Sequence, residues 1–336
     1  MKRFELIQAI FNNQLPREPR QVTATAFAPI NVALCKYWGK RNNELNLPVT
    51  SSLSIAVPTK GTTTTLLWAP EQTQDNIIFN GKEMDPKSSF VQGITQFLDL
   101  FRPQHKWYLQ ATIKMNIALA AGFASSSCGF AALSLALNNL FTWNLEPYKL
   151  SILARLGSGS AARSLWTGFV EWHRGTRDDG MDSHASPLAE DWPALCIGLL
   201  SVCETEKPIS SRKAMQHTVN TSHLYPYWPE KVAQDLVKIK YAIDKRDFSL
   251  LGKLAEQNAL AMHATMLSSQ PPICYFLSDT IAAIRRIWTL RKAGLELYFT
   301  QDAGPNLKLL FLKKDITAIQ KFFPSVEIVS VFSGCI

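Results

Sequence analysis

Several features that would assign a chain to a particular environment are missing from these 336 residues. No two of the six cysteines have the C-x-x-C spacing, and no cysteines and histidines together have the spacing of a zinc site. Most of the cysteines stand in apolar surroundings, as small buried hydrophobic residues do. The pattern favours a reducing, cytoplasmic location over secretion.

Long apolar runs are missing as well. None approaches the roughly 20 residues that a membrane-spanning helix needs, so we expect no membrane partner. The first segment, MKRFELIQAIF, is interrupted by Glu5 and Gln8, and no small-residue cleavage site follows it. It is therefore predicted to form a short amphipathic helix.

The chain carries 35 Lys and Arg against 27 Asp and Glu, a formal net charge of +8, yet it has no continuous basic run. A nucleic-acid-binding arm would concentrate these charges, whereas here they are scattered. With 46% hydrophobic residues the composition is that of a globular protein. The positive excess thus favours phosphorylated small molecules over nucleic acid.

Hydrophobic periodicity predicts strands and helices without strict βαβ alternation, which indicates an α+β protein in two lobes. The expected boundaries are an N-terminal helical extension over 1–22, a first domain over 23–203 and a second over 204–336. The predicted strands are an early one from Thr23, a meander over 51–57, 62–68 and 76–81, then 107–115, 295–300, 307–312 and 326–332. The predicted helices cover about 126–141, 147–157, 229–243, 247–266, 271–293 and 315–323.

Two Gly- and Ser-containing segments lead into predicted helices, where backbone N–H groups and the helix dipole favour anions. The first, AAGFASSSCGF, contains Gly122 and the hydroxyls of Ser125, Ser126 and Ser127. It lacks the Gly-Lys-Ser/Thr ending of a Walker loop, and a Ser-capped buried helix is the alternative. The second, GSGSAARS over 157–164, adds Arg163, whose guanidinium suits a carboxylate or phosphate; an ordinary surface loop is the alternative.

Two further segments carry charge at predicted strand ends. Lys36 and Lys40 flank Tyr37-Trp38-Gly39. An aromatic pair between lysines could contact a membrane surface or stack on nucleic acid, but no basic patch supports either. The alternative is a strand end with solvated lysines. Asp302 lies in TQDAGPN, between the apolar strands 295–299 and 307–312, where the turn chemistry of Gly-Pro-Asn follows. One carboxylate facing two cationic loops could orient a hydroxyl nucleophile for phosphoryl transfer. Its alternative is an aspartate that satisfies the backbone of its own turn.

Other polar residues favour structural interpretations. His263 stands among apolar residues of a predicted helix and is expected to be a satisfied core histidine rather than a ligand. Asp178, Asp179 and Asp182 do not have EF-hand spacing, so a solvated acidic loop is expected there. The ligands of any metal ion are unknown from the sequence.

Taken together, these segments resemble the signatures of diphosphomevalonate decarboxylases, in the GHMP kinase superfamily. The matching segments are APINVALCKYWGKRNNELNLPVTSSLS, AAGFASSSCGFAAL, GSGSAARSLWTGFVEW, DDGMDS, DWP, HAT with PPI, and DAGPN. They stand in family order over roughly residues 23–312. The resemblance implies a two-lobed GHMP kinase fold with the active-site cleft between the lobes.

The resemblance also implies an activity. Such enzymes use ATP and Mg²⁺ to phosphorylate the 3-hydroxyl of mevalonate 5-diphosphate, and loss of that phosphate and of CO₂ yields isopentenyl diphosphate in the mevalonate pathway. The implied catalytic residues are Asp302, Lys36 and Arg163. The implied substrate-binding residues are Tyr37, Ser158, Gly159, Ser160, Ser211 and Arg212, and those for the nucleotide are Asn116, Gly122, Ser125, Ser126 and Ser127.

The chain departs from the family pattern in several places. Asn116-Ile117-Ala118-Leu119 replaces a common Asn-Phe-Pro-Thr, Ala162 replaces a common Cys, and Gln301 replaces a usual Phe. Two other functions therefore stay open: decarboxylation of mevalonate 5-phosphate to isopentenyl phosphate, and a catalytically silent metabolite-binding relative. Many relatives are homodimers, but no residue pattern here indicates an interface.

Overall fold

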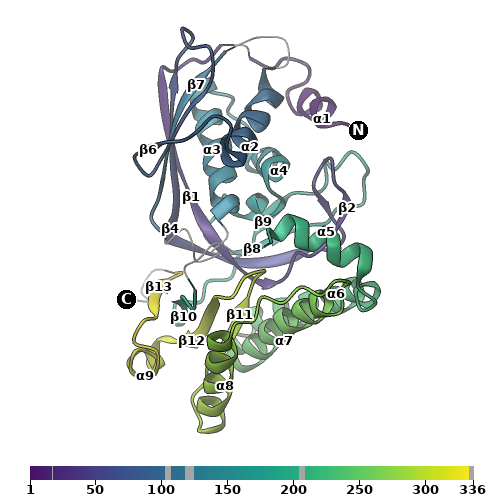
Figure 1. Cartoon of the computed structure of the whole chain (residues 1–336), viewed down its shortest axis with the longest axis vertical. Helices are drawn as coiled ribbons and strands as arrows, with labels where there is room; N and C mark the ends of the chain where they lie inside the picture. The colour runs from purple at the N-terminus through teal and green to yellow at the C-terminus, as the bar shows by residue number, and fades with distance from the viewer. Residues whose placement is uncertain (17, 103–106, 118–124, 204–208, 333–336) are drawn as a thin grey trace.

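The computed structural model of the chain describes residues 1–16, 18–102, 107–117, 125–203 and 209–332. It has two lobes, each built on a β-sheet with helices packed against it (Figure 1). The predicted two-lobed α+β architecture is confirmed. Among the described helices, none is both long and apolar enough to cross a membrane.

The N-terminal lobe holds a seven-stranded sheet in the order β6-β5-β7-β4-β8-β9, with β1 also paired to β4. Helices pack on one of its faces (Figure 1). Its strands are β1 (Thr23–Cys35), β4 (Ser52–Trp68), β5 (Asn76–Phe79), β6 (Lys82–Glu83), β7 (Leu109–Met115), β8 (Gly168–Trp172) and β9 (Ala185–Pro187); β2 (Lys40–Asn42) and β3 (Leu47–Pro48) form a separate hairpin. Its helices are α1 (Arg3–Ile10), α2 (Ser89–Leu98), α3 (Ser125–Phe141) and α4 (Pro147–Gly157), with the 3₁₀ turns η1 (Asp99–Phe101) and η3 (Gly159–Arg163).

The predicted meander is wrong, because 51–57 and 62–68 belong to the single strand β4. Strand β1 pairs antiparallel with β4, and its register jumps from Pro29↔Gly61 to Ile30↔Val57. Residues 58–60 therefore form a bulge, where a proline that lacks an N–H is tolerated. Strand β5 pairs parallel with β7. The predicted Asn80-Gly81 turn does join β5 to β6, with positive φ at both residues.

The C-terminal lobe holds an antiparallel sheet in the order β11-β12-β10-β13. Its strands are β10 (Leu195–Leu200), β11 (Tyr298–Gln301), β12 (Leu307–Leu312) and β13 (Glu327–Ser330). Its helices are α5 (Ser211–Thr221), α6 (Trp228–Asp244), α7 (Phe248–Leu267), α8 (Ser278–Lys292) and α9 (Ile316–Phe322), with η4 (Tyr225–Tyr227) and η5 (Lys313–Asp315).

Two helices of this lobe differ from the sequence predictions. Helix α5 was not predicted, and α8 begins at Ser278 rather than at 271, after a non-helical segment that contains Pro271-Pro272. The division at 203/204 stays a prediction. Strand β10 precedes that division and pairs with β12 and β13 after it, which favours a division before β10.

The cysteines differ from one another. Cys35 and Cys128 are buried thiols, as expected for small hydrophobic residues. Cys203 and Cys274 are less buried thiols, whereas Cys196 is disulfide-bonded. Cys196 is also buried, as expected for most of the cysteines, but it is not a thiol.

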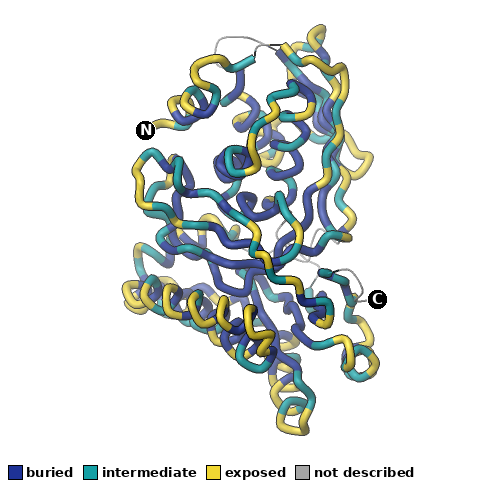
Figure 2. The backbone as a smooth tube through the Cα atoms, turned by 180° about the vertical axis from the view of Figure 1, so that it is seen from behind, coloured by how far each residue is buried: buried dark blue, intermediate teal, exposed yellow. Residues whose placement is uncertain are grey.

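One hydrophobic core crosses the junction between the lobes. It includes Leu34 of β1, Ile55 of β4, Val232 of α6 and Leu251 of α7, and Figure 2 shows continuous buried chain at the junction. There the Oγ1 of Thr300 donates to the carbonyl of Ala33 over 3.0 Å. The ends of β1 and β11 are thereby fixed beside each other, and Lys36 and Asp302 follow directly.

Candidate active site

A carboxylate between two ammonium groups lies where β1 and β11 end. Asp302 immediately follows β11, and its Oδ1 lies 2.8 Å from the Nζ of Lys36, just after β1. Its Oδ2 lies 2.8 Å from the Nζ of Lys308 in β12. Both lysines are almost wholly buried, while the Asp302 side chain is 26% exposed. The carboxylate is thus accessible, with its counter-ions held behind it in the protein.

The surroundings of Asp302 keep it ionised. Burial opposes its charge, but the ammonium groups of Lys308 and Lys36 outweigh that effect and hold the pKa of the carboxyl well below its usual range. For Lys36 burial is the larger effect, and it lowers the pKa of the ammonium despite Asp302. A carboxyl with so low a pKa is a weak proton acceptor and a persistent anion.

Helices of the C-terminal lobe fix both residues. The Oδ1 of Asn258 in α7 accepts from the backbone N–H of Lys36 over 2.8 Å, and the Nδ2 of Asn258 donates to Asp235 of α6 over 2.7 Å. The Nε2 of His263 lies 3.1 Å from the carbonyl of Asp302. Burial lowers the pKa of His263 to about 3, so its imidazole is neutral and Nε2–H donates that bond. The interpretation of His263 as a satisfied core histidine agrees with this geometry.

Arg163 supplies a buried cation without an acidic partner among the described residues. Its guanidinium donates to the Oγ of Ser52 and, over 3.3 Å, to the Oδ1 of Asn31, while Nε has no partner there. Burial lowers the pKa of Arg163 to about 10, and the field of Asp302 partly offsets this. A buried guanidinium that has no acidic partner among the described residues is suited to an incoming carboxylate.

Hydroxyl groups line the segment that links α4 to Arg163. The Oγ of Ser158 lies 3.4 Å from both the Oγ of Ser160 and the Oγ of Ser126, at the start of α3. Tyr37 packs against Gly159, and burial raises the pKa of its phenol. The two predicted Gly/Ser segments are therefore neighbours in space.

Cations lie beside this segment. Arg212, in the first turn of α5 after Ser211, donates to the carbonyl of Gly157 over 3.2 Å. The Nζ of Lys40 lies 2.6 Å from the Oδ1 of Asn46. Burial lowers the pKa of Lys40 to about 8, and the charges of Arg212 and Arg3 lower it further. This end of the site is thus positively charged and suited to phosphate groups.

The structure describes only some of the residues predicted to bind the nucleotide. Gly122 lies outside the described residues, as does the side chain of Ser125. Ser126 is exposed and Ser127 buried in the first turn of α3. Asn116 accepts from the N–H of Gly61 and donates to the carbonyl of Thr59, so its amide holds β4 here.

Within the described chain no group of three or more His, Cys, Asp or Glu residues could hold a metal ion. The acidic loop is bonded internally, since Asp182 accepts from the N–H groups of Thr176 and Arg177, and Asp179 pairs with Arg177. These contacts support the expected structural interpretation of that loop.

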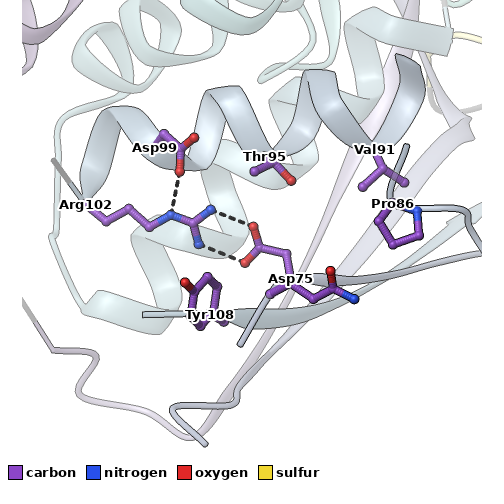
Figure 3. Close-up of a pocket in the computed structure, with 8 residues that line it drawn as sticks. Asp75, Pro86, Val91, Thr95, Asp99, Arg102 and Tyr108 are labelled. Carbon is purple, nitrogen blue, oxygen red and sulfur yellow. Dashed lines mark hydrogen bonds and ion pairs between the residues drawn. The ribbon is translucent and has the colours of Figure 1, made fainter. Parts of the chain in front are cut away.

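A separate hollow in the N-terminal lobe contains none of the candidate residues (Figure 3). Its most polar member, Arg102, already donates to Asp75, Asp99 and the carbonyl of Trp107 through all three of its nitrogens. The guanidinium therefore joins η1 to the residues just before β5 and β7, and its nitrogens are already engaged. The hollow is lined by Gln74, Asp75, Pro86, Val91, Thr95, Asp99, Arg102 and Tyr108.

Comparison with known proteins identifies the architecture that carries this site. Residues 28–185 match the diphosphomevalonate decarboxylase-like N-terminal domain, and residues 197–332 match the mevalonate 5-diphosphate decarboxylase C-terminal domain. The chain belongs to the diphosphomevalonate decarboxylase family. The resemblance predicted from the motifs is confirmed.

Individual relatives agree over nearly the whole chain. Diphosphomevalonate decarboxylase mvd1 of Aspergillus fumigatus is 36% identical over 312 residues, which are 87% of this chain and 77% of the relative. The crystal structure of mevalonate diphosphate decarboxylase from Staphylococcus aureus has a TM-score of 0.87 and 34% identity, covering 92% of this chain and 96% of that one. The complex of MDDEF with MVAPP, AMPPCP and magnesium has a TM-score of 0.87 and 36% identity. The match covers 93% of this chain and 98% of that one.

Proposed function

We propose that the chain performs ATP-dependent decarboxylation of mevalonate 5-diphosphate to isopentenyl diphosphate through the arrangement around Asp302. The observation that supports this most directly is one persistent carboxylate between two ammonium groups, near a buried guanidinium that has no acidic partner among the described residues. Such a site offers an anion to a hydroxyl and a cation to a carboxylate. The substrate carries both groups, together with a diphosphate.

The residues divide into three roles. Asp302 accepts a hydrogen bond from the 3-hydroxyl and orients it, with Lys36 beside the reacting groups. Arg163 binds the substrate carboxylate. The diphosphate is bound by Tyr37, Ser158, Gly159, Ser160, Ser211 and Arg212.

Phosphorylation of the 3-hydroxyl turns a poor leaving group into a good one. As the C3–O bond then ionises, positive character develops at C3, and the electrons of the breaking bond to the carboxylate flow towards it. Phosphate and CO₂ leave, and the double bond forms. Fixed charges such as Asp302 stabilise this separation of charge better than mobile water does.

The reaction also requires ATP and Mg²⁺. The complex of a relative with AMPPCP and magnesium supports this requirement. Asn116, Gly122, Ser125, Ser126 and Ser127 are the proposed nucleotide-binding residues. Of these, Ser125, Ser126 and Ser127 begin α3, where the helix dipole favours phosphate. Magnesium neutralises charge on the transferred phosphoryl group.

The decisive experiment incubates the protein with ATP, Mg²⁺ and either mevalonate 5-diphosphate or mevalonate 5-phosphate, and measures ADP and CO₂ together. We expect both products, with higher kcat/KM for the diphosphate. ADP without CO₂ would reduce the activity to that of a kinase. A higher kcat/KM with the monophosphate would favour that alternative, and neither product with either substrate would contradict the proposal.

We also propose a homodimer in the cytoplasm. The dimer is supported by the outer surface of α6 and the preceding turn, where Tyr227, Val237 and Tyr241 are exposed at 72%, 70% and 57%. Aromatic and aliphatic groups so exposed on one helix are a common element of subunit interfaces. Light scattering should give twice the chain mass, and Tyr241→Glu should reduce it.

A further inference from the structure

Three cations from three separate segments bond to the β2–β3 turn or to the adjoining C-terminal end of α4: Arg3 of α1, Lys40 of β2 and Arg212 of α5. Two of them, Lys40 and Arg212, flank the hydroxyl-lined segment described above. Arg3 comes from the N-terminal helical extension, before the residues 28–332 that the family models match.

Hydrogen bonds tie all three cations to one framework. The Nε of Arg3 donates over 2.7 Å to the carbonyl of Glu44, in the turn between β2 and β3. In the same turn Asn46 accepts from Lys40 and donates over 3.0 Å to the carbonyl of Leu156. Arg212 donates to the next carbonyl, that of Gly157.

Burial and the positive charges within this group of three residues lower the pKa of Lys40 and of Arg3. After burial, Arg212 and Arg3 are the causes that lower the pKa of Lys40. Burial and the charge of Arg212 likewise lower the pKa of Arg3, which Glu44 opposes. Like charges held together in this way repel, and an anion that binds among them relieves the repulsion.

Helix α1 is held firmly enough to fix Arg3 there. Leu6, Ile7 and Ile10 are each at most 2% exposed and belong to the hydrophobic core of the N-terminal lobe. Because that face is packed, the position of Arg3 follows from the fold and not from a flexible terminus.

We propose that Arg3 is a specificity-determining residue that adds a third cation to the diphosphate-binding end of the site. The N-terminal helix α1 thereby favours a substrate with two phosphates over one with a single phosphate. The proposal rests on the proposed function. The hydroxyl-lined segment and Arg212 bind the first phosphate, and the Arg3–Lys40 side meets the additional charge of the second.

The test measures dissociation constants of mevalonate 5-diphosphate and mevalonate 5-phosphate by calorimetry, without ATP, for the wild-type protein, Arg3→Gln, Arg3→Lys and Arg20→Gln. Arg20 is an exposed arginine of the same N-terminal extension, so its variant removes an equal charge elsewhere. Thermal unfolding of each variant verifies that α1 stays packed.

We expect Arg3→Gln to weaken binding of the diphosphate by about fivefold and of the monophosphate by less than about twofold, in line with a partly exposed charge pair. Arg3→Lys should keep most of the affinity, and Arg20→Gln should match the wild type. Equal weakening for both ligands, or none for either, overturns the role of Arg3. If the wild-type protein binds neither ligand, the proposed function itself is overturned.

Discussion

At the scale of single residues, Asp302 differs from an ordinary turn aspartate in what surrounds its two carboxylate oxygens. Each oxygen accepts from a different buried lysine, so neither is free to take up a proton without losing an ion pair. The arrangement favours orientation of the hydroxyl over its outright deprotonation. Protonation of the carboxylate would leave two buried ammonium groups without their counter-ion.

Asp302→Asn is expected to keep substrate binding and to lose most turnover. The amide has nearly the shape of the carboxylate but carries no charge, so kcat should fall about 10²- to 10⁴-fold. Steady-state kinetics and calorimetric binding check this, with the exposed Asp279→Asn as the control. Turnover close to that of the wild type would remove the proposed role of Asp302.

Lys308→Met removes one of the two cations on Asp302 at nearly constant side-chain volume. The pKa of Asp302 should then rise towards its usual range, since Lys308 is the largest of the effects that lower it. The proposed role of Asp302 needs its carboxylate, so the acidic limb of the pH–rate profile should move to higher pH. The control is Lys253→Met, an exposed lysine of α7. Profiles that superimpose on that of the wild type would contradict the prediction.

Gly159→Ala tests the contact between Tyr37 and the hydroxyl-lined segment. A Cβ at Gly159 would lie 2.8 Å from the Oη of Tyr37 and 2.9 Å from ring carbons, so the ring or the segment must move. We expect the KM for the phosphorylated substrate to rise about tenfold or more. Gly129→Ala in α3 meets nothing within 4 Å and should be neutral or stabilising by up to about 1 kcal/mol. An unchanged KM in Gly159→Ala would mean that the segment does not bind substrate.

At the scale of elements, α1 shows how a short helix is stabilised by packing rather than by its own propensity. It has only eight residues, yet its apolar face joins a core shared with α2, α4 and β7. Amphipathic spacing in the sequence predicted the helix. The spacing could not predict which surface it covers.

Leu6→Ala is therefore expected to lower the free energy of unfolding by about 2–4 kcal/mol, because it removes a fully buried side chain from that core. Phe4→Ala, at a side chain that is 40% exposed, should change it by less than about 0.5–1 kcal/mol. Urea denaturation measures both. Equal, small effects would show that α1 adds little to the stability of the lobe.

Sequence patterns predicted helices α3 and α4 but divided strand β4 in two, and the difference has a physical reason. Pro58 and Gly61 are turn signals, but a long partner strand absorbs them in a bulge, so β4 continues through them. Pairing with β1 decides this outcome, and local propensity carries no information about it. Helices α3 and α4 were predicted well because their apolar periodicity and the Pro147 start are local signals.

At the scale of the whole molecule, the site joins residues that are far apart in the chain. Motifs predicted Lys36, Arg163 and Asp302 as site residues, and the structure places Lys36 against Asp302. Lys308 was missed, although a lysine inside the apolar run LKLLFL was a signal that a buried anion lies nearby. Asn258 was missed because it meets Lys36 across 222 residues, a distance that no local pattern spans.

The pH dependence of substrate binding should reflect the charge of the three cations Arg3, Lys40 and Arg212. Because the pKa of Lys40 is about 8, its ammonium loses a proton above that pH, and the KM for the diphosphate should rise by about two- to tenfold between pH 7 and 9.5. Lys40→Met should abolish this component of the dependence. If the wild type and Lys40→Met show parallel curves, Lys40 does not contribute to anion binding.

The same titration has the opposite sign for stability without substrate. Between pH of about 8 and 10.5 an unfolded chain keeps the Lys40 proton that the folded chain has lost. The contribution of Lys40 to the free energy of unfolding therefore rises with pH through this window. Urea denaturation of the wild type and Lys40→Met at pH 7.5 and 10 isolates that contribution.

The bond between Thr300 and Ala33 has a consequence for how the two lobes can evolve. It lies at the base of the site and joins the two strand ends from which Lys36 and Asp302 project. Exchange of either lobe for a distant counterpart is therefore expected to require matching of these two strand ends. Insertions and deletions should accumulate at the outer loops, and recombination within the family should preserve β1 and β11 as a pair.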